Sequence, residues 1–341
     1  MPFVALVIVL LVLLVWALRA KTVGEHPTGA VPSPPRTAPS PARAPSPAPT
    51  RTRFPRGPLL IHATGDVSLD PDYVSTFAAN GYAYAFSGMG GLFTRDDLTI
   101  VNMECPVSRL GAPLPKEFTF ECDPDALPAA KAAGVDVASM ANNHSYDYGP
   151  DALVDTRRNL AAAGLHPVGG GRDPDEAMEA QLFDVNGWRV AVVGIDEVVD
   201  PYPEELAAPG HPGTACGHDV DCMVAAIERA DRDADLVILE IHWGVELDTQ
   251  PEAYQVQQAH RFAAAGADVI FGAHSHRLQP RTVVDGTPVF WSLGNFVWPA
   301  FSAAGSTTAI GEVRVRSDGT IRARLVPVRI VADGHPELVP G

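Results

Sequence analysis

The chain has 341 residues, of which 46% are hydrophobic, and a formal net charge of −16. Seven of its 25 basic residues but only one of its 41 acidic residues precede residue 57, which leaves 18 basic and 40 acidic side chains in the rest. This acidic excess argues against nucleic acid as a partner. The length exceeds that of a typical domain but is common for one large layered α/β unit.

The first predicted element is an apolar segment at residues 1–21. Residues 2–18 carry no charge and would form a helix about 25 Å long, at the short end of what crosses a bilayer. The segment is either a signal anchor or an uncleaved signal peptide, and the lack of a clear Ala-x-Ala cleavage site favours a retained transmembrane anchor. A buried core helix is the weaker alternative, because the segment is apolar on all sides.

A Pro/Ala/Ser-rich disordered linker is expected over residues 22–58, because this composition buries too little apolar surface to fold. Arg19 and Lys21 follow the apolar segment and, by charge bias alone, would place the linker in the cytoplasm. A long tether after an anchor is instead typical of a surface-displayed domain. We therefore expect a single-pass cell-membrane protein whose folded domain, residues 59–341, is extracytoplasmic.

Four cysteines lie in that domain: Cys105, Cys122, Cys216 and Cys222. They allow three pairings, and the short separations favour Cys105 with Cys122 and Cys216 with Cys222. An oxidising compartment would permit both disulfides. None of the four belongs to a C-x-x-C motif, which argues against a zinc knuckle.

The domain repeats one pattern of helix, glycine, apolar strand and polar loop. Residues 59–63 predict a strand that breaks at Gly65 into a loop presenting Asp66, and residues 97–105 predict a second strand. A helix, a stop at Gly134 and a strand at 135–140 follow. The same pattern recurs over 152–171, 188–196, 223–244, 257–276 and 287–296, which predicts an α/β fold. The tail, 309–334, alternates with period two around "SDG" and predicts a β-hairpin.

Polar residues of the kinds that bind metals fall at or just after the ends of these apolar strands. They are Asp66, Asn102, Glu104, Asn142, Asn143, His144, His242, His274, His276 and Asn295. Ligand sites in α/β sheets assemble at the carboxyl ends of strands. Each residue alone has an ordinary explanation, such as a turn, a cap or a hydrogen-bonded structural histidine. Their coincidence at successive strand ends favours one shared site.

Carboxylates, an asparagine carbonyl and several imidazoles are the ligand set of one or two divalent ions of the Mn, Fe or Zn type. Calcium alone would not select histidines. A pair of such ions activates water and stabilises both the attacking and the leaving oxygen in hydrolysis.

Six motifs in order, "TGDVSLD", "VNMECPVS", "ANNHSYDYG", "IHWGVE", "GAHSHRLQP" and "WSLGNF", closely resemble the bacterial capsule-synthesis CapA family. These are poly-γ-glutamate capsule proteins related to calcineurin-like metallophosphoesterases. The resemblance covers roughly residues 59–300 and implies a four-layer α/β/β/α sandwich of the metallo-dependent phosphatase type.

The resemblance also implies roles for individual residues. The implied metal ligands are Asp66, Glu104, Asn143, His242, His274 and His276. His144 would be the general acid or a contact to substrate phosphate, Asp147 would orient the Asn-His loop, and Asn295 would support the site.

Two positions depart from the metallophosphoesterase pattern. Ser68 stands where Asp-x-His would supply an imidazole, and Asn102-Met103-Glu104 replaces a Gly-Asp motif with its further Asp. One metal position would then be weaker, empty or differently ligated.

Our leading hypothesis is a membrane-tethered component of capsule or poly-γ-glutamate biosynthesis or export with a metal-dependent hydrolase-like site. Its expected partners are an anionic surface polymer such as poly-γ-glutamate, or a precursor, and other capsule-synthesis membrane proteins. One alternative is a non-catalytic polymer-binding or anchoring component. Another is a phosphoesterase that acts on a small cell-surface substrate.

Overall fold

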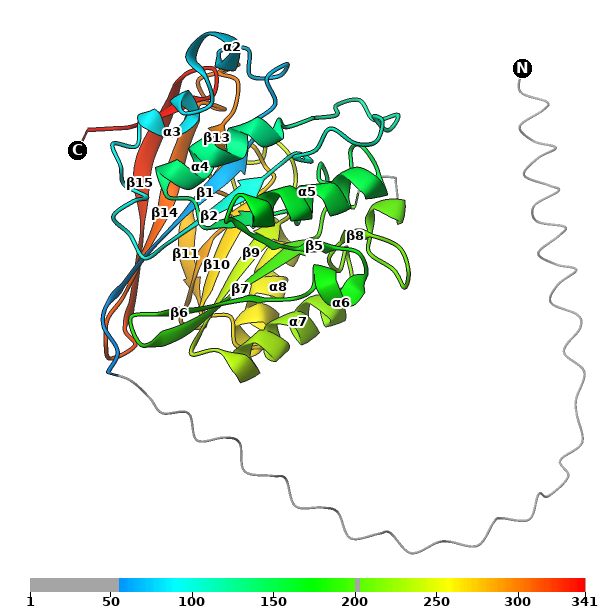
Figure 1. Ribbon diagram of the computed structural model, residues 1–341. Helices are drawn as coiled ribbons and strands as arrows, with labels where there is room; N and C mark the ends of the chain where they lie inside the picture. The colour runs from blue at the N-terminus through cyan, green and yellow to red at the C-terminus, as the bar shows by residue number, and fades with distance from the viewer. Residues whose placement is uncertain (1–54, 200–202, 341) are drawn as a thin grey trace, which may run out of the picture. The chain divides into compact units, whose positions relative to one another are not determined.

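The computed structural model of the chain describes residues 55–199 and 203–340. Over these residues the protein is a mixed α/β fold with two large sheets and a short third one, and the strand order leaves the large sheets open (Figure 1). The predicted anchor at 1–21 and nearly all of the predicted linker at 22–58 lie outside the described residues. Within the described ranges, no helix combines the length and the apolar character needed to cross a membrane.

The first large sheet combines parallel and antiparallel strands. Its strands are β1 (Leu59–Val67), β2 (Leu98–Met103), β3 (Val137–Ser139), β4 (His166–Val168), β13 (Asn295–Val297), β14 (Thr307–Val315), β15 (Ile321–Ala332) and β16 (His335–Leu338). The order is β16-β15-β14-β1-β2-β3-β4, and β13 also pairs with β1. Strands β1 to β4 and β13 run parallel, so their carboxyl ends share one edge. The predicted C-terminal hairpin is confirmed as β14 and β15, which pair antiparallel.

The second large sheet has a parallel centre between two antiparallel edge strands. Its strands are β6 (Gln181–Val185), β7 (Trp188–Asp196), β9 (Leu236–His242), β10 (Val269–Ala273), β11 (Arg281–Val284) and β12 (Thr287–Phe290). Their order is β11-β12-β10-β9-β7-β6. Two short strands, β5 (Gly170–Gly171) and β8 (Gly213–Thr214), form the third sheet.

The described residues form the helices α2 (Phe77–Asn80), α3 (Tyr84–Ser87), α4 (Leu127–Ala133), α5 (Pro150–Ala162), α6 (Pro174–Ala177), α7 (Val220–Asp233) and α8 (Ala253–Ala264), with 3-10 turns η1 (Pro124–Ala126) and η2 (Pro203–Glu205). Side-chain caps begin three of the helices, α6, α7 and α8. Asp219 caps α7, its side chain accepting from the backbone N–H groups of Asp221 and Cys222. The predicted stop at Gly134 is confirmed, because this residue ends α4 with φ 103°.

Buried apolar side chains form three clusters. Successive residues of a strand point to opposite faces of its sheet, and this alternation decides which cluster each side chain joins. In β9, Leu236 and Ile238 face the other large sheet, whereas Val237 and Leu239 face α7 and α8. A third cluster joins the first sheet to α4 and α5. Each large sheet is thus covered by the other on one face and by helices on the opposite face (Figure 1).

The predicted break at Gly65 is wrong, because β1 runs on through this residue to Val67. A Cβ atom on residue 65 would lie 1.7 Å from the carbonyl oxygen of Gly294. Gly65 therefore permits the close approach of two backbones, and Asp66 is presented from a strand instead of a loop.

Both expected disulfides, Cys105–Cys122 and Cys216–Cys222, are confirmed. The first ties the residue after Glu104 to the segment before η1. It therefore fixes the chain next to one of the predicted metal ligands.

Candidate metal centre

The first sheet contributes a row of three polar side chains at its carboxyl edge. Asp66 is in register with Asn102 of β2 on one side and with Asn295 of β13 on the other. The Nδ2 atom of Asn102 donates to Asp66 Oδ1 at 2.9 Å, and the Asn295 Oδ1 atom lies 2.9 Å from His276 Nδ1. The two asparagines therefore hold the carboxylate and an imidazole at fixed positions.

The second sheet contributes three imidazoles to the same place. His242 ends β9, and His274 and His276 follow β10 with φ values of 92° and 51°. Histidine is among the residues that adopt this left-handed region more often than most. His274 Nδ1 lies 3.1 Å from His242 Nε2, while His276 Nδ1 lies 3.0 Å from Asp66 Oδ2. The turn after β10 thus joins the polar edges of the two sheets.

The loop after β3 brings a third group of ligand atoms to this edge. The Oδ1 atom of Asn143 lies 2.9 Å from His242 Nε2. The preceding Asn142 holds the loop, because its Oδ1 accepts from the His144 backbone N–H and the Ser145 hydroxyl. The Asn142 amide also donates to Asn102 Oδ1 at 3.0 Å. Asn142 therefore positions the ligand loop and does not itself face the imidazoles.

Glu104 lies at the centre of the group and is fully buried. Neither of its carboxylate oxygens makes a hydrogen bond within the described residues, and Oε1 lies 3.7 Å from the Nε2 atoms of both His242 and His276. Burial, followed by the negative charge of Asp66, raises its pKa well above the ordinary value. A buried carboxyl group of this kind is either protonated or paired with a positive charge, and a bound metal ion would supply that charge.

Burial and neighbouring charges also shift the pKa values of two other predicted ligands, His242 and Asp66. Burial, with the charges of the other imidazoles, lowers the pKa of His242 well below its ordinary value, which favours the neutral ring that binds metals. Burial would raise the pKa of Asp66, but the hydrogen bond and charge of His276 bring it below its ordinary value.

These residues fit a metal ion. Donor atoms of the buried residues Asp66, Glu104 and His242 lie within 4.8 Å of one another. Nitrogen and carboxylate oxygen donors suit a transition metal. The hydrogen-bond-deficient oxygens of Glu104 are the specific feature that such an ion would satisfy. The structure also places the other predicted ligands, Asn143, His274 and His276, around the same buried group.

His144 and Asp147 form a second polar unit beside this group. Their Nδ1 and Oδ2 atoms are 2.8 Å apart, and Asp147 Oδ2 also accepts from the Phe120 backbone N–H at 2.8 Å. Asp147 Oδ1 pairs with Lys116 Nζ at 2.9 Å, and Lys116 Nζ lies 3.1 Å from Glu205 Oε1. Asp147 is therefore fixed from two sides and in turn orients the His144 ring.

Sequence reasoning missed Lys116 and Asp196. Lys116 lies in an irregular segment with no periodicity, so no sequence pattern predicts its burial. Asp196 ends β7 in register with His242, and its side chain accepts from the Thr214 hydroxyl at 2.8 Å. The strand-end rule that selected the other residues could have found Asp196.

Ser68 does not substitute for the missing imidazole. Its Oγ atom lies 4.0 Å from Cys122 Sγ and accepts from the Asp70 backbone N–H at 3.4 Å. The hydroxyl is thus used beside the disulfide.

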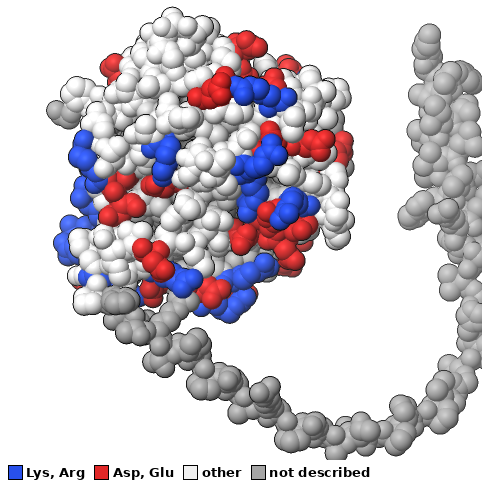
Figure 2. Space-filling model, viewed as in Figure 1, with Lys and Arg blue, Asp and Glu red and all other residues white. Residues whose placement is uncertain are grey.

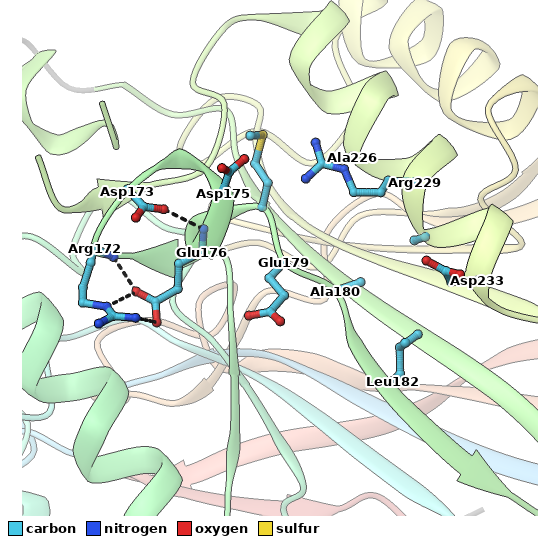
Figure 3. A pocket seen from close by; sticks show the side chains of 12 residues that line it. Arg172, Asp173, Asp175, Glu176, Glu179, Ala180, Leu182, Ala226, Arg229 and Asp233 are labelled. Atoms are coloured by element: carbon cyan, nitrogen blue, oxygen red, sulfur yellow. Dashed lines mark hydrogen bonds and ion pairs between the residues drawn. The ribbon is translucent and has the colours of Figure 1, made fainter. Parts of the chain in front are cut away.

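A cavity of about 500 Å³ lies away from the metal-site residues, against α6, β6 and α7 (Figure 3). Its charged side chains are partly paired with one another. Arg172 pairs with Glu176, and Asp173 caps α6 by accepting from the Glu176 backbone N–H. No predicted site residue lines this cavity, so its size does not make it the functional centre.

Figure 2 shows the distribution of charge on one face of the molecule. On the face drawn in Figure 2, basic and acidic side chains of the described residues are interspersed. The ligand-type side chains discussed above are instead buried or nearly so at the common strand edge.

Comparisons with known proteins show the family to which the chain belongs. A model of the family described as "Bacterial capsule synthesis protein PGA_cap" matches residues 60–300. The PGA biosynthesis protein CapA of Bacillus subtilis (strain 168) is 29% identical over 275 residues, which cover 80% of this chain and 72% of that protein. A probable polyglutamine synthesis accessory protein of Mycobacterium tuberculosis (strain H37Rv) is 30% identical, covering 70% of this chain and 67% of its own length.

Among solved structures, TT1561 of Thermus thermophilus aligns with a TM-score of 0.43 at 11% identity, covering 78% of this chain and 98% of that one. The family assignment rests on the sequence match alone, which spans most of the chain. The chain therefore belongs to the bacterial capsule synthesis protein family PGA_cap.

Proposed function

We propose that the protein is a membrane-tethered, extracytoplasmic component of poly-γ-glutamate capsule biosynthesis or export. In this proposal, the protein hydrolyses a bond of the polymer or of its linkage, and the residues of the candidate centre would hold a metal ion that supplies an activated water. The family description and the name of the Bacillus relative, a PGA biosynthesis protein, support the polymer assignment. The apolar segment and the Pro-rich linker support the location. The proposed fold is the four-layer α/β/β/α sandwich of the metallo-dependent phosphatases.

The observation that carries the proposal is the state of Glu104, a buried carboxylate that has no hydrogen bond within the described residues and lies between two imidazoles. We assign metal binding to Asp66, Glu104, Asn143, His242, His274 and His276. When bound, one or two ions of the Mn, Fe or Zn type would supply an activated water and positive charge for the developing oxyanion.

The chain's own residues would orient the ligands and move a proton. Asn102 and Asn295 hold Asp66 and His276 in position. Because His144 Nδ1 contacts Asp147, Nε2 is the ring nitrogen that would exchange a proton with substrate. His144 is thus assigned as the general acid that protonates the leaving group, and Asp147 as the residue that orients it.

A second candidate function is non-catalytic binding of the polymer through its carboxylates. The observation that favours it is Ser68, whose hydroxyl lies beside the Cys105–Cys122 disulfide where metallophosphoesterases have a ligand. With one metal position weakened, the remaining ion could bind carboxylates without supporting turnover. A phosphoesterase acting on a small cell-surface substrate is the other enzymatic candidate, and it shares the same residues.

The test is elemental analysis of the full-length protein, followed by hydrolysis assays with γ-glutamyl peptides and phosphoesters. We expect one or two transition-metal ions per chain, and their loss in His274→Ala. His144→Ala should retain the metal and lose hydrolysis. If His274→Ala disrupts capsule formation in cells and His144→Ala does not, both enzymatic functions are wrong and the binding function is correct.

The location has an independent test. Protease added to intact cells should remove the folded domain. Protection of the domain in intact cells, together with digestion after lysis, would refute surface display.

A further inference from the structure

A cavity of about 210 Å³ opens directly beside the candidate metal centre. His144, His276 and Asn295 form one end of it, and aromatic side chains form its wall. At the rim, Phe118, Leu247 and Phe301 come from three different loops and are 58%, 58% and 75% exposed. We call this the aromatic cavity.

The wall of the aromatic cavity is packed against the site residues themselves. Trp298 stacks on His276 with 5.0 Å between ring centroids, and Phe120 lies 4.4 Å from the His144 ring. Tyr73 contacts both of these aromatic rings, at 5.3 Å from Trp298 and 4.5 Å from Phe120. The part of a ligand next to the reacting group therefore lies along an apolar surface.

Apart from the two imidazoles, two charged side chains of opposite sign line the aromatic cavity, Glu246 and Arg277. Among the described residues no ion pair joins them. One Nη1 hydrogen bond to the His276 carbonyl oxygen, at 2.8 Å, holds the Arg277 guanidinium beside the site, and its other donors can serve a ligand.

One cation and one anion that line the same cavity without pairing match a ligand group that itself carries both charges. We propose that the aromatic cavity binds the free amino end of a glutamyl chain. Arg277 binds the α-carboxylate of the terminal residue, and Glu246 binds its α-ammonium group. The aromatic wall packs against the two methylenes that lead to the first γ-amide. This inference rests on the proposed function, because it names the part of the polymer that the metal centre receives.

The size of the aromatic cavity agrees with a single terminal residue. At ~30 Å³ per molecule, its volume corresponds to about seven waters, which is enough room for one terminal residue. The charge of the protein points the same way. The chain carries a net charge of −16, which repels the anionic interior of a polyglutamate but not a terminal residue whose α-ammonium balances its α-carboxylate.

Calorimetry with the full-length protein tests the subsite with three probes. These are tri-γ-glutamate, the same peptide acetylated at its amino terminus, and the same peptide with the first α-carboxylate converted to an amide. Acetylation should weaken binding at least tenfold in the unmodified protein and less than twofold in Glu246→Gln. Amidation should weaken binding at least tenfold in the unmodified protein and less than twofold in Arg277→Gln.

Glu246→Gln should keep the tenfold loss of affinity on amidation, and Arg277→Gln should keep the tenfold loss of affinity on acetylation. If either residue had a merely structural role, its variant would reduce both losses together. Glu228→Gln and Arg316→Gln, exposed positions that do not line the aromatic cavity, are the matched charge controls and should keep both losses. Equal binding of the acetylated and unmodified peptides, or absence of binding by all three, would overturn the subsite.

Hydrolysis of the same probes separates this inference from the proposed function. If the selective binding pattern is found without hydrolysis, the subsite stands and the hydrolase proposal fails. If the peptides are hydrolysed equally well with and without the acetyl group, the hydrolase proposal stands and the subsite is refuted.

Discussion

The Nζ atom of Lys116 lies 2.9 Å from Oδ1 of Asp147, with side-chain exposures of only 5% and 0%. Lys116 Nζ also contacts the backbone carbonyl oxygen of Asn143 at 2.5 Å. One buried lysine thereby connects the orienting carboxylate of His144 with the backbone of a proposed metal ligand. Burial would lower the pKa of Lys116, but the charges of Asp147 and Glu205 raise it above its ordinary value, so the ion pair persists at neutral pH.

We predict that Lys116→Met destabilises the protein by about 3 kcal/mol or more, because it leaves the buried carboxylates of Asp147 and Glu205 without their cation. Adding Asp147→Asn to this variant should restore part of the loss. Denaturant unfolding of the single and double variants measures both effects. Lys131→Met is the control, since Lys131 and Asp136 form an exposed pair that we expect to contribute less than about 1 kcal/mol. Equal losses in both lysine variants would contradict the prediction.

A second prediction concerns the change in melting temperature caused by Glu104→Gln, which should reverse in sign when metal is added. The raised pKa of this carboxyl means that the unfolded chain ionises it first, so folding stability is lost as pH rises above the ordinary value. In excess chelator at pH 8, Glu104→Gln should therefore melt at a higher temperature than the unmodified protein. With Zn²⁺ or Mn²⁺ added, the order should invert, because ion binding stabilises only the protein that retains the ligand.

Thermal unfolding with and without metal measures this inversion. Glu252→Gln, in the capping box of α8, is a control for the same change of residue away from the centre and should show no inversion. A variant at Glu104 that melts below the unmodified protein in both conditions would count against a metal-dependent role.

A third prediction is an acid-dependent loss of stability at Glu312. Hydrogen bonds from Arg324, at 2.7 and 2.8 Å, and from Arg314 lower the pKa of Glu312 to about 2. Because this folded-state pKa is below the ordinary 4.5, the stabilisation is complete above that value and is lost as pH falls toward 2. Arg324 is largely exposed, so we expect a contribution of only about 1 kcal/mol.

The measurement is the difference in unfolding free energy between the unmodified protein and Glu312→Gln from pH 6 to 2.5. The difference should shrink between pH 4.5 and 2.5. If it stays constant across this range, the Glu312 carboxylate is not the source of the stabilisation.

The disulfide beside Glu104 provides a fourth prediction. Its partners are 17 residues apart, and removing a cross-link of this size costs about 3 kcal/mol in the loop-closure account. The paired change Cys105→Ala with Cys122→Ala should lower stability by about this amount and also weaken metal binding, because Cys105 adjoins Glu104. The corresponding change at Cys216 and Cys222 opens a loop of 6 residues away from the ligands and should leave metal binding unchanged.

The sequence was most informative where local rules and tertiary structure agree. Asp66, Asn102 and His242 were predictable as site residues because parallel strands bring their carboxyl ends to one edge. The hairpin of β14 and β15 followed from period-two alternation around a Ser-Asp-Gly turn. These signals depend only on neighbouring residues in the chain.

Other features depend on partners far away in sequence. Lys116 is buried because Asp147 and Glu205 surround it, and no periodicity in its own segment indicates this. The aromatic cavity likewise combines residues between Tyr73 and Gly305, whose meeting is decided by the packing of several loops. Gly65 suggested a break in the strand before Asp66. The glycine is instead required because the backbone of Gly294 lies too close for a Cβ atom, and this contact is not visible in the sequence.

The contact between Gly65 and Gly294 gives the fifth prediction, a large loss of stability from the addition of a single methyl group. In Gly65→Ala the new Cβ would lie 1.7 Å from the Gly294 carbonyl oxygen, so β1 and the segment before β13 must separate. Asp66 and Asn295 are in register across this pair of strands. Separation of the strands therefore also moves Asp66, a proposed metal ligand, away from Asn295, which holds the His276 ring. We expect a loss of at least about 3 kcal/mol in stability together with loss of bound metal.

Gly57→Ala is the matched control, since its added Cβ meets its nearest neighbour at 3.4 Å, an ordinary contact. This variant should change stability by less than about 1 kcal/mol, because it removes only backbone freedom from the unfolded chain. Denaturant unfolding and elemental analysis of both variants give the two readouts. If Gly65→Ala unfolds at the same denaturant concentration as the unmodified protein and keeps its metal, the close approach of β1 to Gly294 is not what positions Asp66.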